Sequence, residues 1–297
     1  MYYESMKIVV FDNRLTPEVQ QQIQALTSEP IVFPKERYLP EAELIEKTGN
    51  AEIVLVSPWD RVTKNYLDAC PNLKYVCLCG TSAANIALHE LQKRSIAFTN
   101  VVSHGKESVA EFVFMQLVSL ARGVGEYQWK PEQRQLMGKS IGIIGLGAVG
   151  QGTAHIALAY KMNVAYAAPH HKLEWEARGV QHRTVPDLLR ASDILVLAAP
   201  TNVQVLGGEE FKLIKPGSII VQASSGTPLD KPAFFEWIAK DGNFAIFDKS
   251  AGKDNYNVYK DIPRVIFSEK VGGDTYETDE RRGDMVVKNL KAYLTEQ

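Results

Sequence analysis

The chain has 297 residues, of which 45% are hydrophobic and 23% charged, and its formal net charge is −2 at pH 7. This length suits two domains better than one small core. The balanced charge excludes a global field that would recruit nucleic acid or an anionic membrane. No apolar run reaches the ~18 residues needed to span a bilayer, and the first residues lack the basic stretch and apolar core of a signal peptide.

The three cysteines are an odd, clustered set, which does not fit a disulfide framework. Cys77 and Cys79 lie in one apolar strand with no matching His or Cys pair, so we expect them to pack as small hydrophobic side chains and expect no metal site. This pattern predicts a reduced, cytoplasmic protein.

The first hundred residues alternate short apolar runs with amphipathic helical stretches. Such nearly continuous apolar strands indicate a parallel sheet that helices cover on both faces. The expected strands are 7–11, 31–33, 53–56, 75–78 and 96–99, and the expected helices begin at Thr16 or cover 40–47 and 85–93.

The stretch 108–122 is a helix with apolar residues on nearly every face. A helix of this kind is buried on all sides, so it should lie between domains or between subunits. A second strand–helix series starts at Ser140 and ends in an amphipathic helix at 281–294. Its expected strands are 141–144, 164–167, 194–198, 218–221, 244–247 and 265–267.

A glycine-rich turn follows the first strand of this second series and opens a helix that runs to about Tyr160. The turn is Gly145-Leu146-Gly147-Ala148-Val149-Gly150. In such a turn the first glycine permits the tight bend, the second lets the backbone approach a pyrophosphate, and the third lets helix and strand pack closely. The helix N-terminus offers N–H groups and partial positive charge to the phosphates. The turn therefore predicts dinucleotide binding.

The end of the next strand should reveal which dinucleotide binds, because an acidic residue there holds the ribose 2′-hydroxyl of NAD. The sequence reads Ala168-Pro169-His170-His171-Lys172 and has no acid. The two histidines and the lysine would favour a 2′-phosphate, which makes NADP the somewhat favoured form of an NAD(P) cofactor. The alternative is a solvated loop that happens to carry basic residues.

Several motifs together resemble the D-isomer-specific 2-hydroxyacid dehydrogenase family over essentially the whole chain. They are Leu136-Met137-Gly138-Lys139 before the glycine turn, Thr99-Asn100-Val101, the Val109-Ala110-Glu111 helix and the loop 80–86. The resemblance implies an α/β protein with a flavodoxin-like substrate domain, residues 1–102 and 276–297. A Rossmann NAD(P)-binding domain, residues 103–275, is inserted into it. It also implies a homodimer that buries the 108–122 helix and a small-molecule substrate.

The resemblance also implies which residues contact the cofactor beyond the glycine turn. Pro169 occupies part of the family's Asp-Pro position, and Asp248 matches a residue near the nicotinamide. The remaining candidate contacts follow later strands: Ala199, Pro200, Ala223, Ser224, Gly272 and Gly273.

All three catalytic positions of the family carry different residues in this chain. Ser225 stands at the position of the Arg that grips a substrate carboxylate, and Lys270 stands at the position of the His proton donor. The Glu that supports the His corresponds to Ala251, or to Ser250 in an ungapped match. A serine hydroxyl carries no charge and cannot make the bidentate contact of a guanidinium.

Two functions fit these replacements. In the first, the protein is an NAD(P)-dependent oxidoreductase in which Lys270 is the general acid, assisted by Ser225 and His104, and the substrate is a small carbonyl compound or oxo acid. In the second, catalysis is lost and the protein is a dinucleotide-binding regulator. Lys270 as a cleft-edge lysine that faces water and His104 as an ordinary polar loop residue are the alternatives to their catalytic roles.

Overall fold

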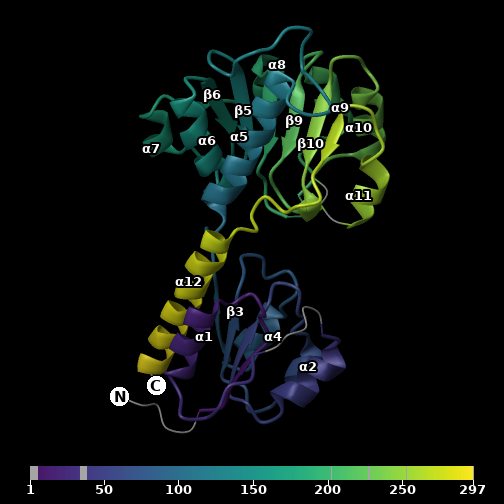
Figure 1. The fold of residues 1–297 in the computed structure, drawn as a ribbon. Helices are drawn as coiled ribbons and strands as arrows, with labels where there is room; N and C mark the ends of the chain where they lie inside the picture. The colour runs from purple at the N-terminus through teal and green to yellow at the C-terminus, as the bar shows by residue number, and fades with distance from the viewer. Residues whose placement is uncertain (1–5, 34–38, 202, 227, 252, 297) are drawn as a thin grey trace. The chain divides into compact units, whose positions relative to one another are not determined.

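The computed structural model describes residues 6–33, 39–201, 203–226, 228–251 and 253–296. The chain divides into two compact units (Figure 1). Unit 1 comprises Met1–His104 and Tyr276–Gln297, and unit 2 comprises Gly105–Thr275. Within the described residues, no helix is long and apolar enough to cross a membrane.

Unit 1 is built on a four-stranded parallel sheet in the order β1-β2-β3-β4. The strands are β1 (Ile8–Val10), β2 (Ile53–Val56), β3 (Tyr75–Leu78) and β4 (Ala97–Asn100). The cysteines at 70, 77 and 79 are free and fully buried, as expected of small core residues.

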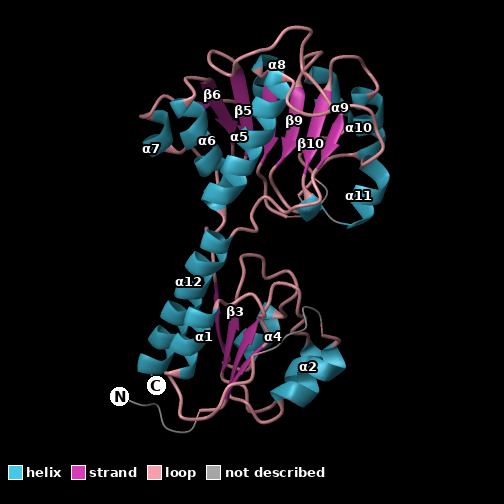
Figure 2. Ribbon diagram, in the orientation of Figure 1, coloured by secondary structure: helices cyan, strands magenta, loops and turns pink. Residues whose placement is uncertain are grey.

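Helices cover both faces of this sheet (Figure 2). One face packs against α1 (Pro17–Gln24) and α12 (Tyr276–Thr295), and the other against α2 (Glu41–Thr48), α3 (Lys64–Ala69) and α4 (Leu88–Lys93). Helix α12 lies directly beside α1, although the two are at opposite ends of the sequence (Figure 1). A Cβ atom on Gly283 would lie 2.4 Å from the Val19 side chain, so glycine is required at this close approach.

The expected strand at 31–33 is wrong, because these residues pair with no strand. Pro30 and Pro34 flank the run, and a proline cannot donate a hydrogen bond to a sheet. Ile31 and Phe33 still pack partly against the core. The apolar pattern therefore identified burial correctly, but not the strand.

Unit 2 contains a seven-stranded parallel sheet in the order β11-β10-β9-β8-β5-β6-β7. All six strands expected here are present: β5 (Ser140–Ile144), β6 (Asn163–Ala167), β8 (Ile194–Leu197), β9 (Ile219–Gln222), β10 (Phe244–Phe247) and β11 (Val265–Phe267). The two-residue β7 (Gln181–His182) was not predicted. Strand order reverses between β5 and β8, and open α/β sheets bind ligands at the carboxyl ends of the strands beside such a point.

Two layers of helices cover this sheet (Figure 2). The first layer is α5 (Lys106–Arg122), α6 (Ala148–Ala159) and α7 (Leu173–Glu176). The second is α8 (Val185–Ala191), α9 (Gly208–Leu213), α10 (Lys231–Ile238) and α11 (Lys253–Tyr259).

Helix α5 is less completely buried within one chain than its composition suggested. Val113, Phe114 and Leu117 lie in the core, whereas Met115 is 54% exposed and Val118 is half-buried. One apolar face of α5 is therefore available to another surface.

Candidate nucleotide-binding and catalytic site

The glycine turn between β5 and α6 has the geometry that its sequence predicts. Gly145 has a φ of +93°, and a Cβ there would lie 2.6 Å from the carbonyl oxygen of Ala198. A Cβ on Gly150 would lie 2.1 Å from the carbonyl oxygen of Gly145. Only glycine fits either position, so these two residues shape the turn.

Gly147 has a different role, because a Cβ there would meet nothing within 4 Å. It is the N-cap of α6, where no side chain caps the helix and no acidic residue lies in the first turn. The open space above Gly147 and the uncapped N–H groups suit a pyrophosphate, which the helix dipole also favours. The residues present therefore fit a dinucleotide.

A carboxylate from α7 contacts the basic loop after β6, and sequence reasoning did not identify it. Glu176, from α7, accepts a hydrogen bond from the Tyr166 hydroxyl at 2.7 Å and lies 2.9 Å from His171 Nδ1. The Tyr166 hydrogen bond and then His171 lower the pKa of Glu176. The Glu176 carboxylate therefore already has hydrogen-bond partners in Tyr166 and His171. His170 and Lys172, by contrast, are exposed after β6.

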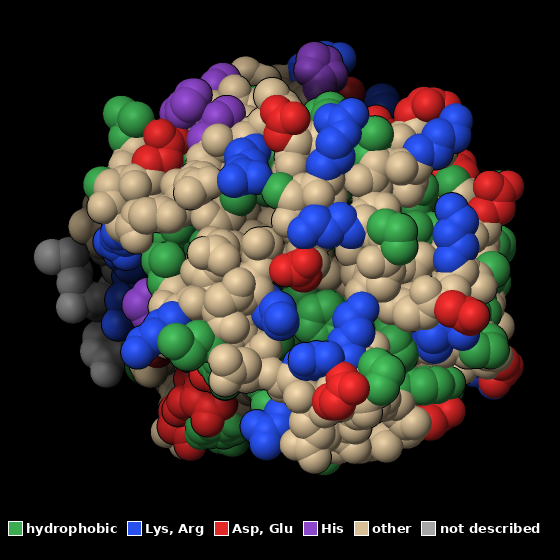
Figure 3. Space-filling model, turned by 90° about the horizontal axis from the view of Figure 1, so that it is seen from above, with side chains coloured by type: hydrophobic (Ala, Val, Ile, Leu, Met, Phe, Trp, Pro, Cys, Tyr) green, Lys and Arg blue, Asp and Glu red, His purple; other side chains and the backbone are tan. Residues whose placement is uncertain are grey.

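More basic side chains join this loop from β7. The His182 ring lies 4.0 Å from that of His171, and the Arg183 backbone N–H donates to the Tyr166 carbonyl. Histidine side chains form a visible group at one edge of the face seen in Figure 3. Sequence reasoning missed His182 and Arg183 because a two-residue strand gives almost no periodic signal.

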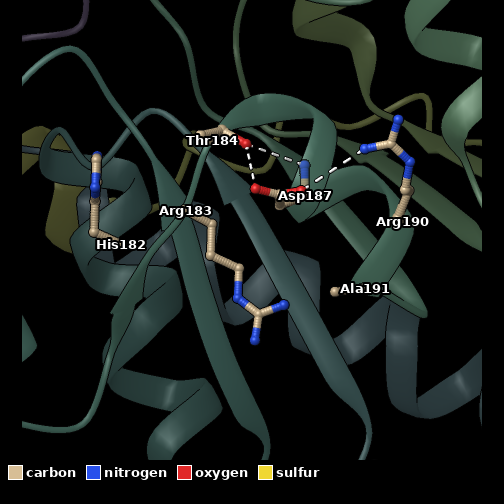
Figure 4. A pocket seen from close by; sticks show the side chains of 6 residues that line it. All are labelled: His182, Arg183, Thr184, Asp187, Arg190 and Ala191. Atoms are coloured by element: carbon tan, nitrogen blue, oxygen red, sulfur yellow. Dashed lines mark hydrogen bonds and ion pairs between the residues drawn. The ribbon is translucent and has the colours of Figure 1, made fainter.

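A pocket of about 680 Å³ opens beside this group. Within it, the Thr184 hydroxyl donates to Asp187 at 2.7 Å, and Arg190 reaches the same carboxylate at 3.7 Å. Figure 4 shows Arg183 extending away from that pair. The lining residues are His182, Arg183, Thr184, Asp187, Arg190 and Ala191.

The loops after β9, β10 and β11 meet at the carboxyl edge of the large sheet. The Gly226 N–H donates to the Ser250 carbonyl at 3.4 Å, and the Lys249 N–H donates to the Lys270 carbonyl at 3.2 Å. These bonds bring together the segments that carry the sequence candidates Ser225 and Lys270.

Asp248 ties two of these loops together. Its Oδ2 accepts the Gly272 N–H at 2.6 Å, and its Oδ1 accepts the N–H and the hydroxyl of Ser250. Asp248 is 5% exposed. Its hydrogen bond from Gly272 holds the loop after β11 against the end of β10. Gly272 and Gly273 lie close to Phe112 and Val109 of α5, where a Cβ would approach within 2.8 Å and 3.3 Å, respectively.

The candidate catalytic side chains in unit 2 are accessible. Lys270 and Ser225 are exposed, while the neighbouring Ser224 hydroxyl is buried and lacks a hydrogen-bond partner among the described residues. Gln222 was not among the site residues predicted from the sequence. Its side chain is buried and donates to the carbonyls of Ser224 and Gly226, so it fixes the loop that carries Ser225.

The other positions expected to touch cofactor lie at the same edge. Ala199 is buried and Pro200 is exposed in the loop after β8, and Ala223 follows β9. The sequence resemblance assigns the supporting Glu position to Ala251 or to Ser250. Ala251 is buried, and the Ser250 hydroxyl donates a hydrogen bond to Asp248. Neither position supplies a carboxylate.

His104, the third candidate, is the last residue of the first segment of unit 1. Burial and then the charges of Arg282 and Arg14 lower its pKa to about 4. The ring is therefore neutral near pH 7, which makes it a hydrogen-bonding group and a poor proton donor.

Comparison with known proteins finds a family model that resembles part of unit 2. Residues 113–251 match the NAD-binding domain of the D-isomer-specific 2-hydroxyacid dehydrogenases. A glyoxylate reductase of Thermococcus kodakarensis is 28% identical over 316 residues, which cover 97% of this chain and 93% of that protein. A D-3-phosphoglycerate dehydrogenase of Methanocaldococcus jannaschii is 27% identical over 276 residues, which cover 86% of this chain and 52% of that protein.

Solved structures share the fold at lower identity. An acyclic imino acid reductase in complex with NADPH and D-Arg superposes with a TM-score of 0.82 at 23% identity, covering 98% of both chains. The D-lactate dehydrogenase from Aquifex aeolicus, complexed with NAD and lactic acid, gives 0.80 at 20% identity, covering 98% of this chain and 96% of that one.

Proposed function

Because residues 113–251 match the NAD-binding domain of the D-isomer-specific 2-hydroxyacid dehydrogenases, we propose that the protein is an NAD(P)-dependent reductase of a small oxo acid or related carbonyl compound. The observation that carries the proposal is the Gly145–Gly150 turn, with its open helix N-terminus at Gly147. Relatives named glyoxylate reductase that align with 97% of the chain support the substrate class.

The reaction adds a hydride to the carbonyl carbon and a proton to the carbonyl oxygen, and the bound dinucleotide supplies the hydride. Lys270 is our candidate for the proton. Its ammonium is exposed, and its loop is held to the end of β10 by the hydrogen bond from Gly272 to Asp248. The Ser225 hydroxyl, on the neighbouring loop, would orient the carbonyl by one hydrogen bond.

Replacing Lys270 with methionine tests this assignment. We expect Lys270→Met to lower kcat for glyoxylate at least a hundredfold, because general acid catalysis contributes 10²–10⁴-fold. The Kd for NADPH, measured by fluorescence titration, should stay within about twofold, because the loss concerns proton transfer alone.

The matched control is Lys212→Met, which removes an exposed lysine of α9 that pairs with Glu209 at the surface. Its kcat should equal that of the wild type. If Lys270→Met retains full turnover, Lys270 is not the acid.

The second candidate function is a dinucleotide-binding regulator without catalysis. It is favoured by Ser225, Lys270 and Ala251, which occupy the three positions where the resembling family has catalytic residues. A screen of oxo acids that leaves both NADH and NADPH unconsumed, while either one binds at micromolar concentration, would select this function over the reductase.

We further propose that NADP is the preferred dinucleotide and that the protein forms a homodimer through α5. The exposed His170 and Lys172 after β6, and His182, whose ring lies 4.0 Å from that of His171, support the first proposal. The apolar face of α5 around Met115 supports the second.

A further inference from the structure

The pocket at the edge of the large sheet contains a guanidinium group that has no carboxylate partner. The pocket has a volume of about 680 Å³ and is lined by residues from the end of β7 and from α8, all in unit 2. This volume lies within the ~300–1,000 Å³ range of small-molecule sites in proteins. Arg183 lines the space, and Figure 4 shows its side chain extending away from the pair that Thr184 forms with Asp187.

The Arg183 side chain is held in place by a neutral neighbour. Arg183 is half-buried, and its Nη2 donates to Gln181 Oε1 at 2.8 Å. Within the described part of the chain, no carboxylate forms an ion pair with Arg183. Withdrawing a charge from water without pairing it costs free energy. An anion in the pocket would offset this cost at Arg183.

The other charged groups leave the lining of the pocket with an excess of positive charge. Arg190 Nη1 lies 3.7 Å from Asp187 Oδ1, and the Thr184 hydroxyl donates to Asp187 at 2.7 Å. Asp187 is the one carboxylate among the described lining residues, and it already has a cationic partner. Arg183 and Arg190 therefore outnumber it, so the pocket attracts anions.

Both walls of the pocket are fixed by contacts with the core of unit 2. The Arg183 backbone N–H donates to the Tyr166 carbonyl at 2.9 Å, which holds the end of β7 against β6. Leu188 and Leu189 are fully buried and anchor α8. A ligand would meet a site that is already formed, so little affinity would be lost to reorganisation.

The pocket lies apart from the glycine turn. Strand β6 separates β7 from β5, and neighbouring strands are ~4.8 Å apart, which puts β7 roughly 10 Å from β5. From the end of β7 the pocket follows α8 as far as Ala191, shortly before β8 begins at Ile194. A ligand in the pocket and a pyrophosphate at Gly147 would therefore occupy different places.

We propose that this pocket is a binding site for a small molecule that carries a phosphate group, with Arg183 as its main ligand and Arg190 as the second. The parallel N–H groups of a guanidinium match phosphate oxygens, and a phosphate monoester carries about −1.5 to −2 charges at pH 7, which suits two arginines. The volume of the pocket leaves room for an organic group beside the phosphate. This site goes beyond the proposed function, because binding here requires neither hydride transfer nor the glycine turn.

Inorganic phosphate is the probe for this site, in a buffer without other oxyanions. Its Kd is measured by calorimetry, both without NADPH and with saturating NADPH. We expect binding at millimolar concentration, and we expect Arg183→Met to raise the Kd at least tenfold. Asp187→Asn should lower the Kd at least twofold, because it removes the negative charge paired with Arg190. The matched control Arg178→Met removes an exposed arginine that pairs with Glu174 outside the pocket, and it should leave the Kd unchanged.

Four outcomes would overturn the site: no binding of phosphate to the wild type at millimolar concentration, equal Kd values for Arg183→Met and the wild type, an equal loss in Arg178→Met, or binding that NADPH abolishes. The last result would assign the phosphate to the dinucleotide site. A cooperative thermal transition shows that each variant is folded. Should Arg183→Met not fold, Arg183→Lys decides, since it keeps the charge without the paired donors and should raise the Kd at least twofold. If NADPH does not bind, the proposed reductase fails, and the titrations without NADPH still decide the pocket through their dependence on Arg183.

Discussion

Asp248 and Gln222 are polar residues whose side chains serve neighbouring loops. Asp248 accepts hydrogen bonds from Ser250 and Gly272, and Gln222 donates two to the loop that carries Ser225. Both are buried, and buried polar side chains in proteins are nearly always hydrogen-bonded. The exposed candidates for chemistry, Ser225 and Lys270, are therefore positioned by buried neighbours, and the predictions for these candidates depend on an intact network beneath them.

His104 makes stability depend on pH in a defined direction. Its pKa in the folded protein is lowered from 6.5 to about 4, so below pH 6.5 the unfolded chain takes up a proton that the folded chain refuses. The free energy of unfolding therefore falls as pH drops from 6.5 to 4, by at most about 3 kcal/mol from this residue. We expect His104→Gln to remove this part of the loss, as measured by urea unfolding at pH 7.5 and pH 4.5.

The comparison isolates His104 because the other titrating groups remain in both proteins. Burial raises the pKa values of Asp12 and Asp60. Their contribution to the free energy of unfolding therefore falls as pH rises, which is opposite to the effect of His104. His89→Gln, an exposed change on α4, serves as the control and should keep the wild-type pH dependence. Equal slopes for His104→Gln and the wild type would show that His104 does not titrate as described.

At the scale of elements, the sequence predicts most strands and misses contacts that arise between elements. Strands β5, β6, β8, β9, β10 and β11 were predictable because parallel strands buried on both faces are continuous apolar runs. The segment at 31–33 has the same apolar character, but its flanking prolines prevent pairing. Glu176 and Arg282 were missed because their partners, His171 and Asp12, meet them only after the chain folds.

The loop after β6 decides the preference between NADP and NAD in our proposal. Replacing His170, His171 and Lys172 by glutamine removes the basic groups that would attract a 2′-phosphate. We expect the Kd for NADPH to rise at least tenfold and the Kd for NADH to change less than about twofold, both measured by fluorescence titration. Lys240→Gln, an exposed change after α10, should alter neither. A preference for NADPH that survives the triple change would place selectivity elsewhere.

At the scale of the whole molecule, the candidate nucleotide-binding turn and the candidate proton donor lie in the same unit. Unit 2 has the glycine turn and the exposed Lys270. The chain passes between the units twice, after His104 and before Tyr276. Because Lys270 is the candidate proton donor and does not belong to the glycine turn, changes at Lys270 should lower kcat and leave dinucleotide binding nearly unchanged.

The apolar face of α5 makes the oligomeric state a test of the molecule as a whole. Met115 is 54% exposed on a helix whose other apolar residues are buried or half-buried, and Tyr160, whose ring stacks on Phe114 of the same helix, is 42% exposed. Exposed apolar side chains that lie together on one surface mark an interaction site. In sedimentation velocity, we expect the wild type to be a dimer at micromolar concentration and Met115→Lys to be a monomer, because a charge buried without a partner at an interface is strongly unfavourable.

Leu173→Lys is the matched control, since it places the same charge on an exposed leucine of α7, outside the face of α5. That variant should remain a dimer. A monomeric wild type would contradict the proposed dimer, and a dimeric Met115→Lys would move its interface away from α5. Because α5 also packs against α6 and against Gly272 in the loop that carries Lys270, a monomeric variant with reduced kcat would connect dimer formation to the catalytic edge of unit 2.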